Sequence, residues 1–485
     1  MSTLKRYKLR ETTILIIRGL MAKVLLAVPP GCEELEIYRV TGIKAPPLGL
    51  AWIASVLENH GHEVKIIDSP TLGLSTSEFA KIVKSWCPDL VGLSSLTPTI
   101  KLAYKAAKVV KAVDRNINVV IGGVHATFMW REVLNECPHV DYVVLGEGEE
   151  SMPQLVECLE KGVKPRSVPG IAMRNEDGEP TCTGPWRFVD LETLPPPARH
   201  LLPMDKYTVL GKPIRVAHLM ASRGCPYGCI FCVTSYYFGR RVRFRKVENV
   251  LNEVEECIDR YKARTLIFTD DEFTINRKWI ESFLKGLKDR GLDVEWTCGA
   301  RVDSVDERLL LKMYSSGCKA IYFGVESGSQ ETINKIGKRI SLSQVKKVFE
   351  IIKRIGCSAV ATFMLGFPWE TVDDMRQTMK FALKLDPDYA QFTYVTPYPG
   401  TPLYEMAKKH NLIVDHEWSH YTTIRPVMRG FFFTLKDVET VFKEAYLRFY
   451  GRLKFLVKHI KSGTLKAFLK IIFDNVILPR LRGSL

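Results

Sequence analysis

Three cysteines lie within eight residues of this 485-residue chain, in a segment whose residue types suit metal binding. The segment reads Ser222-Arg223-Gly224-Cys225-Pro226-Tyr227-Gly228-Cys229-Ile230-Phe231-Cys232 and directly follows a predicted strand. Three cysteines are one ligand short of a closed zinc site, and no histidine follows at zinc-finger spacing. Three thiolates do suit a [4Fe–4S] cluster that leaves one iron open. A zinc knuckle completed by a distant cysteine is the alternative.

Charged side chains and turns follow the predicted strands downstream of the cysteines. An acidic run, Thr269-Asp270-Asp271-Glu272-Phe273, ends the next strand, and Arg301 and Glu326 follow the two strands after it. The turns Gly366-Phe367-Pro368-Trp369-Glu370 and Pro397-Tyr398-Pro399-Gly400 follow the last two. Each feature alone is ordinary loop chemistry, but their common position after successive strands indicates one shared site.

The spacing Cys-x3-Cys-x2-Cys, with an aromatic residue just before the last cysteine, resembles the motif of the radical S-adenosylmethionine (SAM) enzymes. In that family the open iron binds SAM, and an electron from the cluster cleaves it to methionine and a 5′-deoxyadenosyl radical that abstracts a substrate hydrogen. The resemblance implies that Cys225, Cys229 and Cys232 bind the cluster, and that an electron donor of the ferredoxin or flavodoxin type is a partner. The SAM-binding residues that it implies are Phe231, Asp270, Asp271 and Glu272 (for the amino group), Arg301 (for the carboxylate) and Glu326 (for the ribose).

Six strand–helix repeats must position these residues. The predicted strands are His218–Ser222, Leu266–Thr269, Glu295–Ala300, Ala320–Gly324, Ala359–Leu365 and Tyr389–Thr396. Six repeats in about 190 residues suit a partial (β/α)6 TIM barrel better than a complete barrel of about 250 residues. We therefore expect a radical SAM core over residues 216–410, with its site at the carboxyl ends of the strands.

A second series of alternating strands and helices precedes the cysteines. Its predicted strands are Lys23–Val28, Val64–Asp68, Leu90–Ser94, Val119–Gly122 and Tyr142–Leu145. Such alternation predicts a doubly wound, Rossmann-like α/β domain over residues 21–162, preceded by an extension of residues 1–20. Residues 163–215 are rich in proline and turn residues, so we expect a linker that packs on the next domain.

The loops after these first strands are rich in glycine and hydroxyl side chains, and ligands of such sheets bind at that edge. The resemblance covers roughly residues 20–410 and is to the radical SAM subclass with an N-terminal cobalamin (B12)-binding domain. Hydroxyl groups there can hydrogen-bond the amides of a tetrapyrrole. The implied cobalamin residues are Ser94, Ser95, Thr97, Thr99, Gly122, Gly123, His125, Gly146 and Glu147.

The motif Asp-x-His-x-x-Gly, by which many cobalamin proteins offer a histidine to cobalt, is absent. Residues 29–49 contain no histidine. Cobalamin then binds without a protein ligand from that motif, or the domain has lost it. His125 is a candidate substitute in a different loop, and the alternative role for it is a hydrogen bond within that loop.

Aromatic residues near the ends of the second series are candidates for work on the substrate. Tyr236 and Tyr237 follow the cysteine segment, and Tyr398 follows the last strand. One of these three tyrosines is a candidate radical or proton relay, and packing of the barrel mouth is the alternative role for each of them.

The composition excludes several classes of protein. With 46% hydrophobic and 25% charged residues, the chain is neither disordered nor a polytopic membrane protein. Nine of the twelve cysteines are scattered singly, unlike a secreted disulfide framework, so we expect a cytoplasmic protein. The apolar stretch Thr12–Val28 is interrupted by Arg18 and Lys23 and is neither a convincing signal peptide nor a spanning helix.

The formal charge of +15 is concentrated near the C-terminus, where Val441–Leu485 carries ten basic and two acidic residues. Apolar residues recur there at three- or four-residue spacing, so the region 411–485 is predicted to contain basic amphipathic helices. Such helices suit an anionic membrane surface, and we expect peripheral binding at the inner face of the membrane. Helices that cap the barrel with a solvated basic face are the alternative.

Relatives in this subclass that modify hopanoid or archaeal tetraether lipids share the expected architecture. The main expectation is therefore functionalisation of an unactivated sp3 carbon of a membrane lipid, by tetraether cyclopentane-ring formation or by headgroup carbon–carbon coupling such as calditol synthesis. The alternative is a cobalamin-dependent radical SAM C-methyltransferase acting on a lipid or small metabolite. A tRNA methylthiotransferase is disfavoured because a second cysteine set and a C-terminal β-barrel pattern are missing, so nucleic acid is not an expected partner. A non-enzymatic iron–sulfur protein would leave the SAM-site series unexplained.

Overall fold

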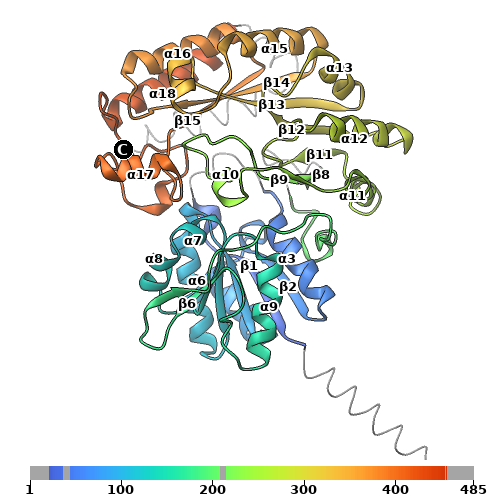
Figure 1. Ribbon diagram of the computed structural model, residues 1–485, viewed down its shortest axis with the longest axis vertical. Coiled ribbons are helices and arrows are strands. Elements are labelled where there is room, and N and C mark those ends of the chain that lie inside the picture. Colours follow the sequence, from blue (N-terminus) through green and yellow to red (C-terminus); the bar gives the residue numbers. More distant parts are fainter. Residues whose placement is uncertain (1–20, 36–43, 208–214, 454, 456–485) are drawn as a thin grey trace, which may run out of the picture. The chain divides into compact units, whose positions relative to one another are not determined.

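The computed structural model describes residues 21–35, 44–207, 215–453 and 455 of the chain. These residues form two compact units that divide between residues 207 and 215 (Figure 1). Within these ranges, no helix combines the length and the apolar character needed to cross a membrane.

A seven-stranded sheet forms the centre of the first unit (Figure 1). Its order is β2-β1-β3-β4-β5-β6-β7; β1 to β5 are parallel, and β6 and β7 are antiparallel additions. The strands are β1 (Lys23–Val28), β2 (Glu63–Asp68), β3 (Leu90–Ser94), β4 (Asn118–Gly122), β5 (Tyr142–Val144), β6 (Ile171–Arg174) and β7 (Pro180–Cys182). The helices are α3 (Leu48–Asn59), α4 (Ser69–Leu72), α5 (Thr76–Trp86), α6 (Ile100–Val113), α7 (Val124–Phe128), α8 (Trp130–Glu136) and α9 (Gly148–Glu160). The order 2-1-3-4-5 of the parallel strands is doubly wound, as predicted.

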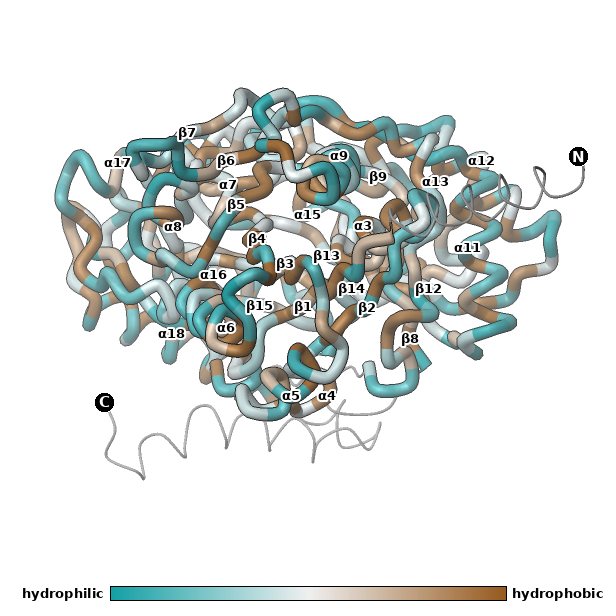
Figure 2. The backbone as a smooth tube through the Cα atoms, turned by 90° about the horizontal axis from the view of Figure 1, so that it is seen from below, coloured by the Kyte–Doolittle hydropathy of each residue, from teal (hydrophilic) through white to brown (hydrophobic). Residues whose placement is uncertain are grey.

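The sequence of the central strands explains this layering. β1, β3 and β4 are nearly continuous apolar runs and are largely hydrophobic in Figure 2. A strand covered by helices on both faces needs apolar residues at every position. The flanking helices α5 and α6 are amphipathic and bury one side each. The carboxyl ends of the strands are therefore the edge where polar loops gather.

Residues 163–207 belong to this first unit, so the prediction that they form a linker packed on the next domain is wrong. β6 buries Ile171, Ala172 and Met173 as it pairs with β5. The guanidinium of Arg174 donates hydrogen bonds to the carbonyls of Val140 (2.7 Å) and Cys137 (2.9 Å). Strands of three and four residues are too short to show a period among many prolines, which is why the sequence pattern missed them.

The second unit contains a six-stranded, all-parallel sheet in the order β15-β14-β13-β12-β11-β8. These strands are β8 (Val216–Leu219), β11 (Thr265–Phe268), β12 (Glu295–Ala300), β13 (Cys318–Glu326), β14 (Ser358–Leu365) and β15 (Tyr389–Tyr394). The helices are α10 (Thr234–Tyr237), α11 (Val247–Asp259), α12 (Arg277–Asp289), α13 (Glu307–Ser315), α14 (Gln330–Lys335), α15 (Leu342–Ile355), α16 (Val372–Leu385), α17 (Pro402–Lys409) and α18 (Leu435–Tyr450). The predicted partial (β/α)6 barrel is confirmed, and a small two-stranded antiparallel sheet of β9 (Ser222–Arg223) and β10 (Arg243–Phe244) was not predicted.

Helix α18 covers the edge strand β15. The hydroxyl of Tyr446 bonds to the backbone nitrogen (3.3 Å) and oxygen (3.0 Å) of Phe392, and Tyr450 does the same at Ala390 (3.2 and 2.6 Å). Phe442 stacks on the ring of Tyr394 with centroids 4.1 Å apart. An exposed strand edge presents unpaired backbone groups, and these hydroxyls satisfy them.

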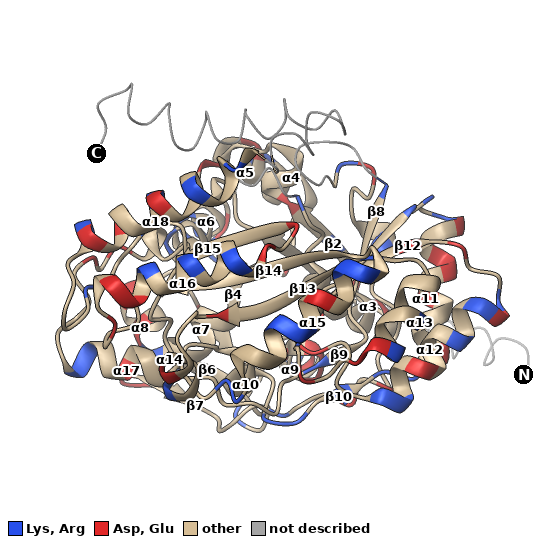
Figure 3. Ribbon diagram, turned by 90° about the horizontal axis from the view of Figure 1, so that it is seen from above, with Lys and Arg blue, Asp and Glu red and all other residues tan. Residues whose placement is uncertain are grey.

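For this helix the barrel-capping alternative is therefore correct, and its apolar face is not free for a membrane. Its charges are also balanced, with three basic and three acidic residues, and both colours appear on α18 in Figure 3. Most of the predicted basic region, residues 456–485, lies outside the described residues.

Candidate functional site

The cysteine loop is held in one conformation by its neighbours in the second unit. Gly224 has φ +99°, and a side chain there would meet the Arg241 carbonyl at 2.3 Å, so only glycine fits. The backbone nitrogen of Ile230 donates to Ile336 (3.1 Å), just after α14. The carbonyl of Ile230 accepts from Leu403 (3.0 Å) at the start of α17. The loop is thus fixed from both sides before any ligand binds.

The three predicted cluster ligands lie together on this loop as free thiols. Burial raises the pKa of each thiol, that of Cys225 to about 12, and the charge of Cys232 raises the pKa of Cys225 and Cys229 further. No group of three metal-binding side chains in the described part of the chain is arranged to hold a single metal ion. A [4Fe–4S] cluster binds its thiolates at three separate irons, and three cysteines within eight residues of one loop supply such a donor set.

Asp270 connects the end of β11 to the segment that leads into the cysteine loop. Its carboxylate accepts hydrogen bonds from the Ala221 backbone nitrogen, 3.1 Å from each oxygen, and from the Ser222 hydroxyl (2.5 Å). Burial raises the pKa of Asp270 to about 7 in spite of these bonds. Both oxygens accept hydrogen bonds within the chain, so Asp270 helps to position the segment before the cysteine loop, and its predicted contact with the SAM amino group stays a prediction.

The next two acidic residues, Asp271 and Glu272, form fewer hydrogen bonds within the chain than Asp270. Asp271 accepts a hydrogen bond from the Thr234 hydroxyl (2.9 Å), and solvent still reaches its side chain. Partial desolvation by the surrounding protein raises the pKa of Asp271 to about 6. Glu272 is buried, and its Oε2 has no hydrogen-bond partner among the described residues. Burial raises the pKa of Glu272 to about 8, although Arg301 and Lys338 oppose the shift. An unpaired buried carboxyl oxygen is costly and fits a ligand with a hydrogen-bond donor.

Arg301 is already engaged by its own chain. Its guanidinium forks onto Asp303 (2.8 and 2.9 Å) and donates to the Lys338 carbonyl (2.6 Å). It also lies 3.5 Å from the centroid of the Tyr227 ring in the cysteine loop. Two nitrogens of the guanidinium predicted to bind the SAM carboxylate thus face Asp303, and Arg301 also braces the cysteine loop.

Glu326 lies at the end of β13 in a buried ion pair with Lys338, with Nζ and Oε1 2.7 Å apart. Its backbone has φ +67°, a left-handed conformation that costs a non-glycine residue about 1–3 kcal/mol. A side chain at Gly324 would come within 2.4 Å of the Glu326 carboxylate and 2.5 Å of the Lys338 ammonium. The positive charge of Lys338 also opposes the rise in the pKa of Cys229 that burial causes.

Sequence reasoning missed two of these groups. Lys338 lies in the turn after α14, where a search of strand ends does not look. Asp303 follows Arg301 by two residues, and that short acid–base spacing was the available signal.

The predicted tyrosines differ in their surroundings. The Tyr398 hydroxyl donates to the Tyr421 carbonyl (3.0 Å), and Tyr237 is buried against the Phe238 ring at 4.7 Å. These contacts agree with the packing alternative, and the relay role of both residues stays a prediction. The Tyr236 hydroxyl accepts a bond from Arg240 (3.4 Å) and stays a candidate relay. The predicted SAM contact Phe231 packs on Phe367, with ring centroids 6.0 Å apart.

In the first unit, the predicted cobalamin residues after β3 and β4 bind one another. Ser94 and Gly122 are register partners at the strand ends, and Ser95 bonds to the Gly122 carbonyl through its nitrogen (2.8 Å) and hydroxyl (3.0 Å). Gly123 has φ +106°, and a side chain there would lie 2.3 Å from the Ser95 carbonyl. Ser95 and Gly123 therefore fix the two loops against each other.

His125 is buried beside Thr97, with Nδ1 3.3 Å from the Thr97 hydroxyl. Burial lowers its pKa to about 4, so its imidazole is neutral at physiological pH. Thr99 accepts from the backbone nitrogen of Leu96 (2.9 Å) and caps the same loop. The hydrogen bond of His125 thus joins its loop after β4 to the loop after β3, and its role toward cobalamin stays a prediction.

The glycine after β5, Gly146, leaves room for the side chain of Trp186. Gly146 has φ +65°, and a side chain there would lie 2.0 Å from the Trp186 indole. Glu147 accepts a hydrogen bond from the Val189 backbone (2.8 Å). Sequence reasoning missed Trp186, whose Nε1 is buried without a partner among the described residues. An orphaned N–H beside hydroxyl-rich loops fits a ligand rich in amide oxygens, such as cobalamin.

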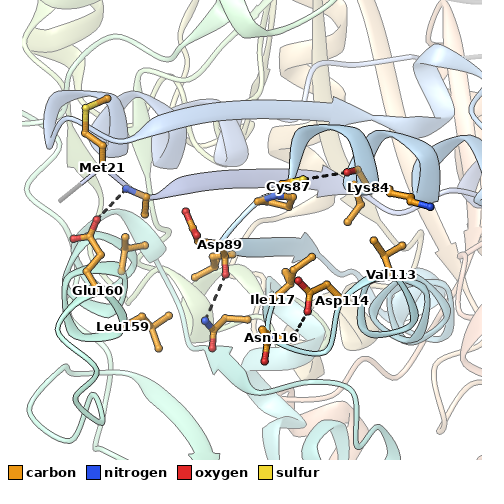
Figure 4. A pocket seen from close by; sticks show the side chains of 16 residues that line it. Met21, Lys84, Cys87, Asp89, Val113, Asp114, Asn116, Ile117, Leu159 and Glu160 are labelled. Carbon is orange, nitrogen blue, oxygen red and sulfur yellow. Dashed lines mark hydrogen bonds between the residues drawn. The ribbon is translucent and has the colours of Figure 1, made fainter. Parts of the chain in front are cut away.

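A hollow of about 670 Å³ lies at the opposite, amino ends of β1, β3 and β4 (Figure 4). Two of its carboxylates hold the start of β1, because Asp89 accepts from the Lys23 nitrogen (2.7 Å) and Glu160 from the Ala22 nitrogen (2.9 Å). None of the predicted cobalamin residues lines it.

Gly123→Ala is expected to lower the free energy of unfolding by about 1–3 kcal/mol and to weaken cobalamin retention, because both the backbone conformation and the Ser95 carbonyl oppose a methyl group. The control is Gly178→Ala, where φ is +84° but a side chain would meet nothing within 4 Å. Urea unfolding and the cobalamin absorbance of the purified protein measure the two effects. Equal behaviour of the two variants would contradict the steric argument.

Comparison with known proteins identifies both units. The B12-binding domain model matches residues 37–156, and the radical SAM superfamily model matches residues 219–382. An uncharacterised methyltransferase of Pyrococcus horikoshii is 41% identical over 90% of this chain and 94% of its own length. The anaerobic magnesium-protoporphyrin IX monomethyl ester cyclase of Rubrivivax gelatinosus is 30% identical, over 89% of this chain and 80% of its own.

A solved structure has the same fold. The radical SAM methyltransferase TsrM from Kitasatospora setae, with cobalamin and a [4Fe–4S] cluster bound, aligns with a TM-score of 0.69 at 18% identity, over 80% of this chain and 78% of that one. The two domain matches and the relatives confirm the predicted cofactors. The chain belongs to the cobalamin-dependent radical SAM enzymes, which use a [4Fe–4S] cluster, SAM and cobalamin.

Proposed function

We propose that this chain is a radical SAM methyltransferase that transfers a methyl group to a carbon atom of its substrate. The observation that supports it most is the relative named a methyltransferase, which shares 41% of its residues across nearly its whole length. The relative named a cyclase is more distant, at 30% identity. The earlier alternative of C-methylation is thus favoured over tetraether ring formation and headgroup coupling.

In this proposal Cys225, Cys229 and Cys232 hold the cluster. Asp271, Glu272 and Glu326 contact SAM, and the loops after β3, β4 and β5 hold cobalamin. When bound, these groups supply a 5′-deoxyadenosyl radical and a transferable methyl group.

The chain's own residues then orient the ligands and exclude water. Asp270 and Arg301 brace the cysteine loop through the Ala221 nitrogen and the Tyr227 ring. Glu272 has a pKa of about 8 and is therefore largely protonated at neutral pH. A cation bound beside it favours the carboxylate, so we expect binding of the SAM amino group to release a proton from Glu272.

The substrate class is open to a direct test. Cells with and without the protein are fed methionine labelled with a CD3 group, and their lipid and polar extracts are compared by mass spectrometry. We expect a protein-dependent compound that carries the intact CD3 group and disappears in a Cys229→Ala strain. Its presence in the lipid extract would support a lipid substrate. A protein-dependent compound without the label would contradict methyl transfer.

A further inference from the structure

Three exposed arginines lie around the cysteine loop. Arg240 and Arg241 follow α10, and Arg339 follows α14, far away in the sequence. We call these three residues the basic patch.

Close packing places the basic patch against the segment that carries the cysteines. A side chain at Gly228, directly before Cys229, would lie 3.3 Å from the Arg240 guanidinium. The carbonyl of Arg241 fills the space beside Gly224, directly before Cys225, at 2.3 Å. On the other side, Gly337, two residues before Arg339, lies beside the loop, because a side chain there would lie 3.4 Å from the Gly228 carbonyl.

The charge of the basic patch is not neutralised. None of its three guanidiniums forms an ion pair with a carboxylate of the described ranges, and Arg240 donates to the Tyr236 hydroxyl and lies over the Tyr236 ring. The neighbouring Lys335, in contrast, pairs with Glu331 at 2.6 Å. A cluster of unpaired positive charge on the surface attracts an acidic partner and accelerates its association.

Reductive cleavage of SAM requires one electron, which has to enter through the cluster. A protein donor must approach the cysteine loop closely, because electron transfer slows steeply with distance. We propose that Arg240, Arg241 and Arg339 form the docking surface for an acidic, low-potential electron-transfer protein, a ferredoxin or flavodoxin. One electron passes from the reduced donor to the oxidised cluster, with no group transferred. This inference rests on the proposal that Cys225, Cys229 and Cys232 hold the cluster.

The test uses the full-length, cluster-loaded enzyme with the charge reversals Arg241→Glu and Arg339→Glu combined. Arg240 is kept, so that its contact with Tyr236 is unchanged. With a reduced acidic ferredoxin as the only reductant at low ionic strength, we expect 5′-deoxyadenosine formation to slow about tenfold or more. With dithionite the rate should equal that of the unchanged enzyme, because a small reductant needs no docking surface. Added salt should slow the unchanged enzyme toward the variant in the ferredoxin assay.

The matched control reverses Lys408 and Lys409, two exposed lysines at the end of α17, and should leave both rates unchanged. An unaltered ferredoxin-driven rate in the Arg241/Arg339 variant would overturn the proposal. An equal loss with both reductants would also overturn it, since it would show a structural role. The assay measures 5′-deoxyadenosine and not methyl transfer, so the docking surface can be tested even if the chain does not transfer a methyl group. Absence of 5′-deoxyadenosine from the unchanged enzyme with dithionite would instead overturn the cluster assignment and the docking surface with it.

Discussion

Replacing Cys229 by alanine is expected to leave the protein without its [4Fe–4S] cluster and to reduce 5′-deoxyadenosine formation from SAM to the level without protein. Cys229 is buried, and it lies on a loop that Ile230 ties to α14 and α17. The backbone therefore cannot move another donor into its place. Alanine at Cys225 or Cys232 should have the same effect. Iron and sulfide content, the electron paramagnetic resonance signal of the reduced cluster and chromatography of the nucleosides measure it.

The matched control is Cys87→Ala, which removes an exposed free thiol at the end of α5 in the first unit. This variant should keep its iron and its activity. Full cluster content in a Cys229→Ala variant would show that the cluster has another ligand, and the site would have to be assigned again.

Replacing Lys338 by methionine is expected to lower the free energy of unfolding by about 3–5 kcal/mol, because it leaves the Glu326 carboxylate buried without its partner. Replacing both residues, as Lys338→Met with Glu326→Leu, should recover much of this loss, since two apolar groups carry no unpaired charge. Denaturant unfolding of the cluster-free protein, followed by a signal from the second unit, measures both variants.

The control for this pair is Lys335→Met, which removes an exposed ion pair with Glu331 on α14. Exposed pairs contribute less than about 1 kcal/mol, so this variant should be close to the unchanged protein. If Lys338→Met lowers the free energy of unfolding no more than Lys335→Met does, the buried ion pair does not stabilise the site.

Fold and cofactors were largely predictable, because they depend on patterns that are local in sequence. Three cysteines in eight residues and the alternation of strands and helices are visible without a structure. The partners of individual side chains were not. Arg301 was expected to be free for a carboxylate, but Asp303 fills its fork at 2.8 Å. Gly146 was expected to lie beside cobalamin, and the sequence did not show that the Trp186 indole packs against it.

The C-terminal region shows a second limit. An amphipathic helix pattern over 435–450 predicts that one face packs on an apolar partner, but it does not distinguish a lipid surface from a sheet. For α18 the partner is a sheet, because the hydroxyls of Tyr446 and Tyr450 hydrogen-bond to the open backbone edge of β15. That match depends on the position of an edge strand some 50 residues earlier in the chain, which no local pattern reveals.

Methyl transfer itself is tested most directly with purified, cluster- and cobalamin-loaded protein in an extract of cells that lack it. SAM with a CD3 group and a low-potential reductant are added without oxygen, and S-adenosylhomocysteine, 5′-deoxyadenosine and labelled products are quantified. We expect both nucleosides to form in a protein-dependent manner, together with a product that carries the CD3 group. Formation of 5′-deoxyadenosine without S-adenosylhomocysteine and without a labelled product would contradict a methyltransferase and indicate a different radical reaction.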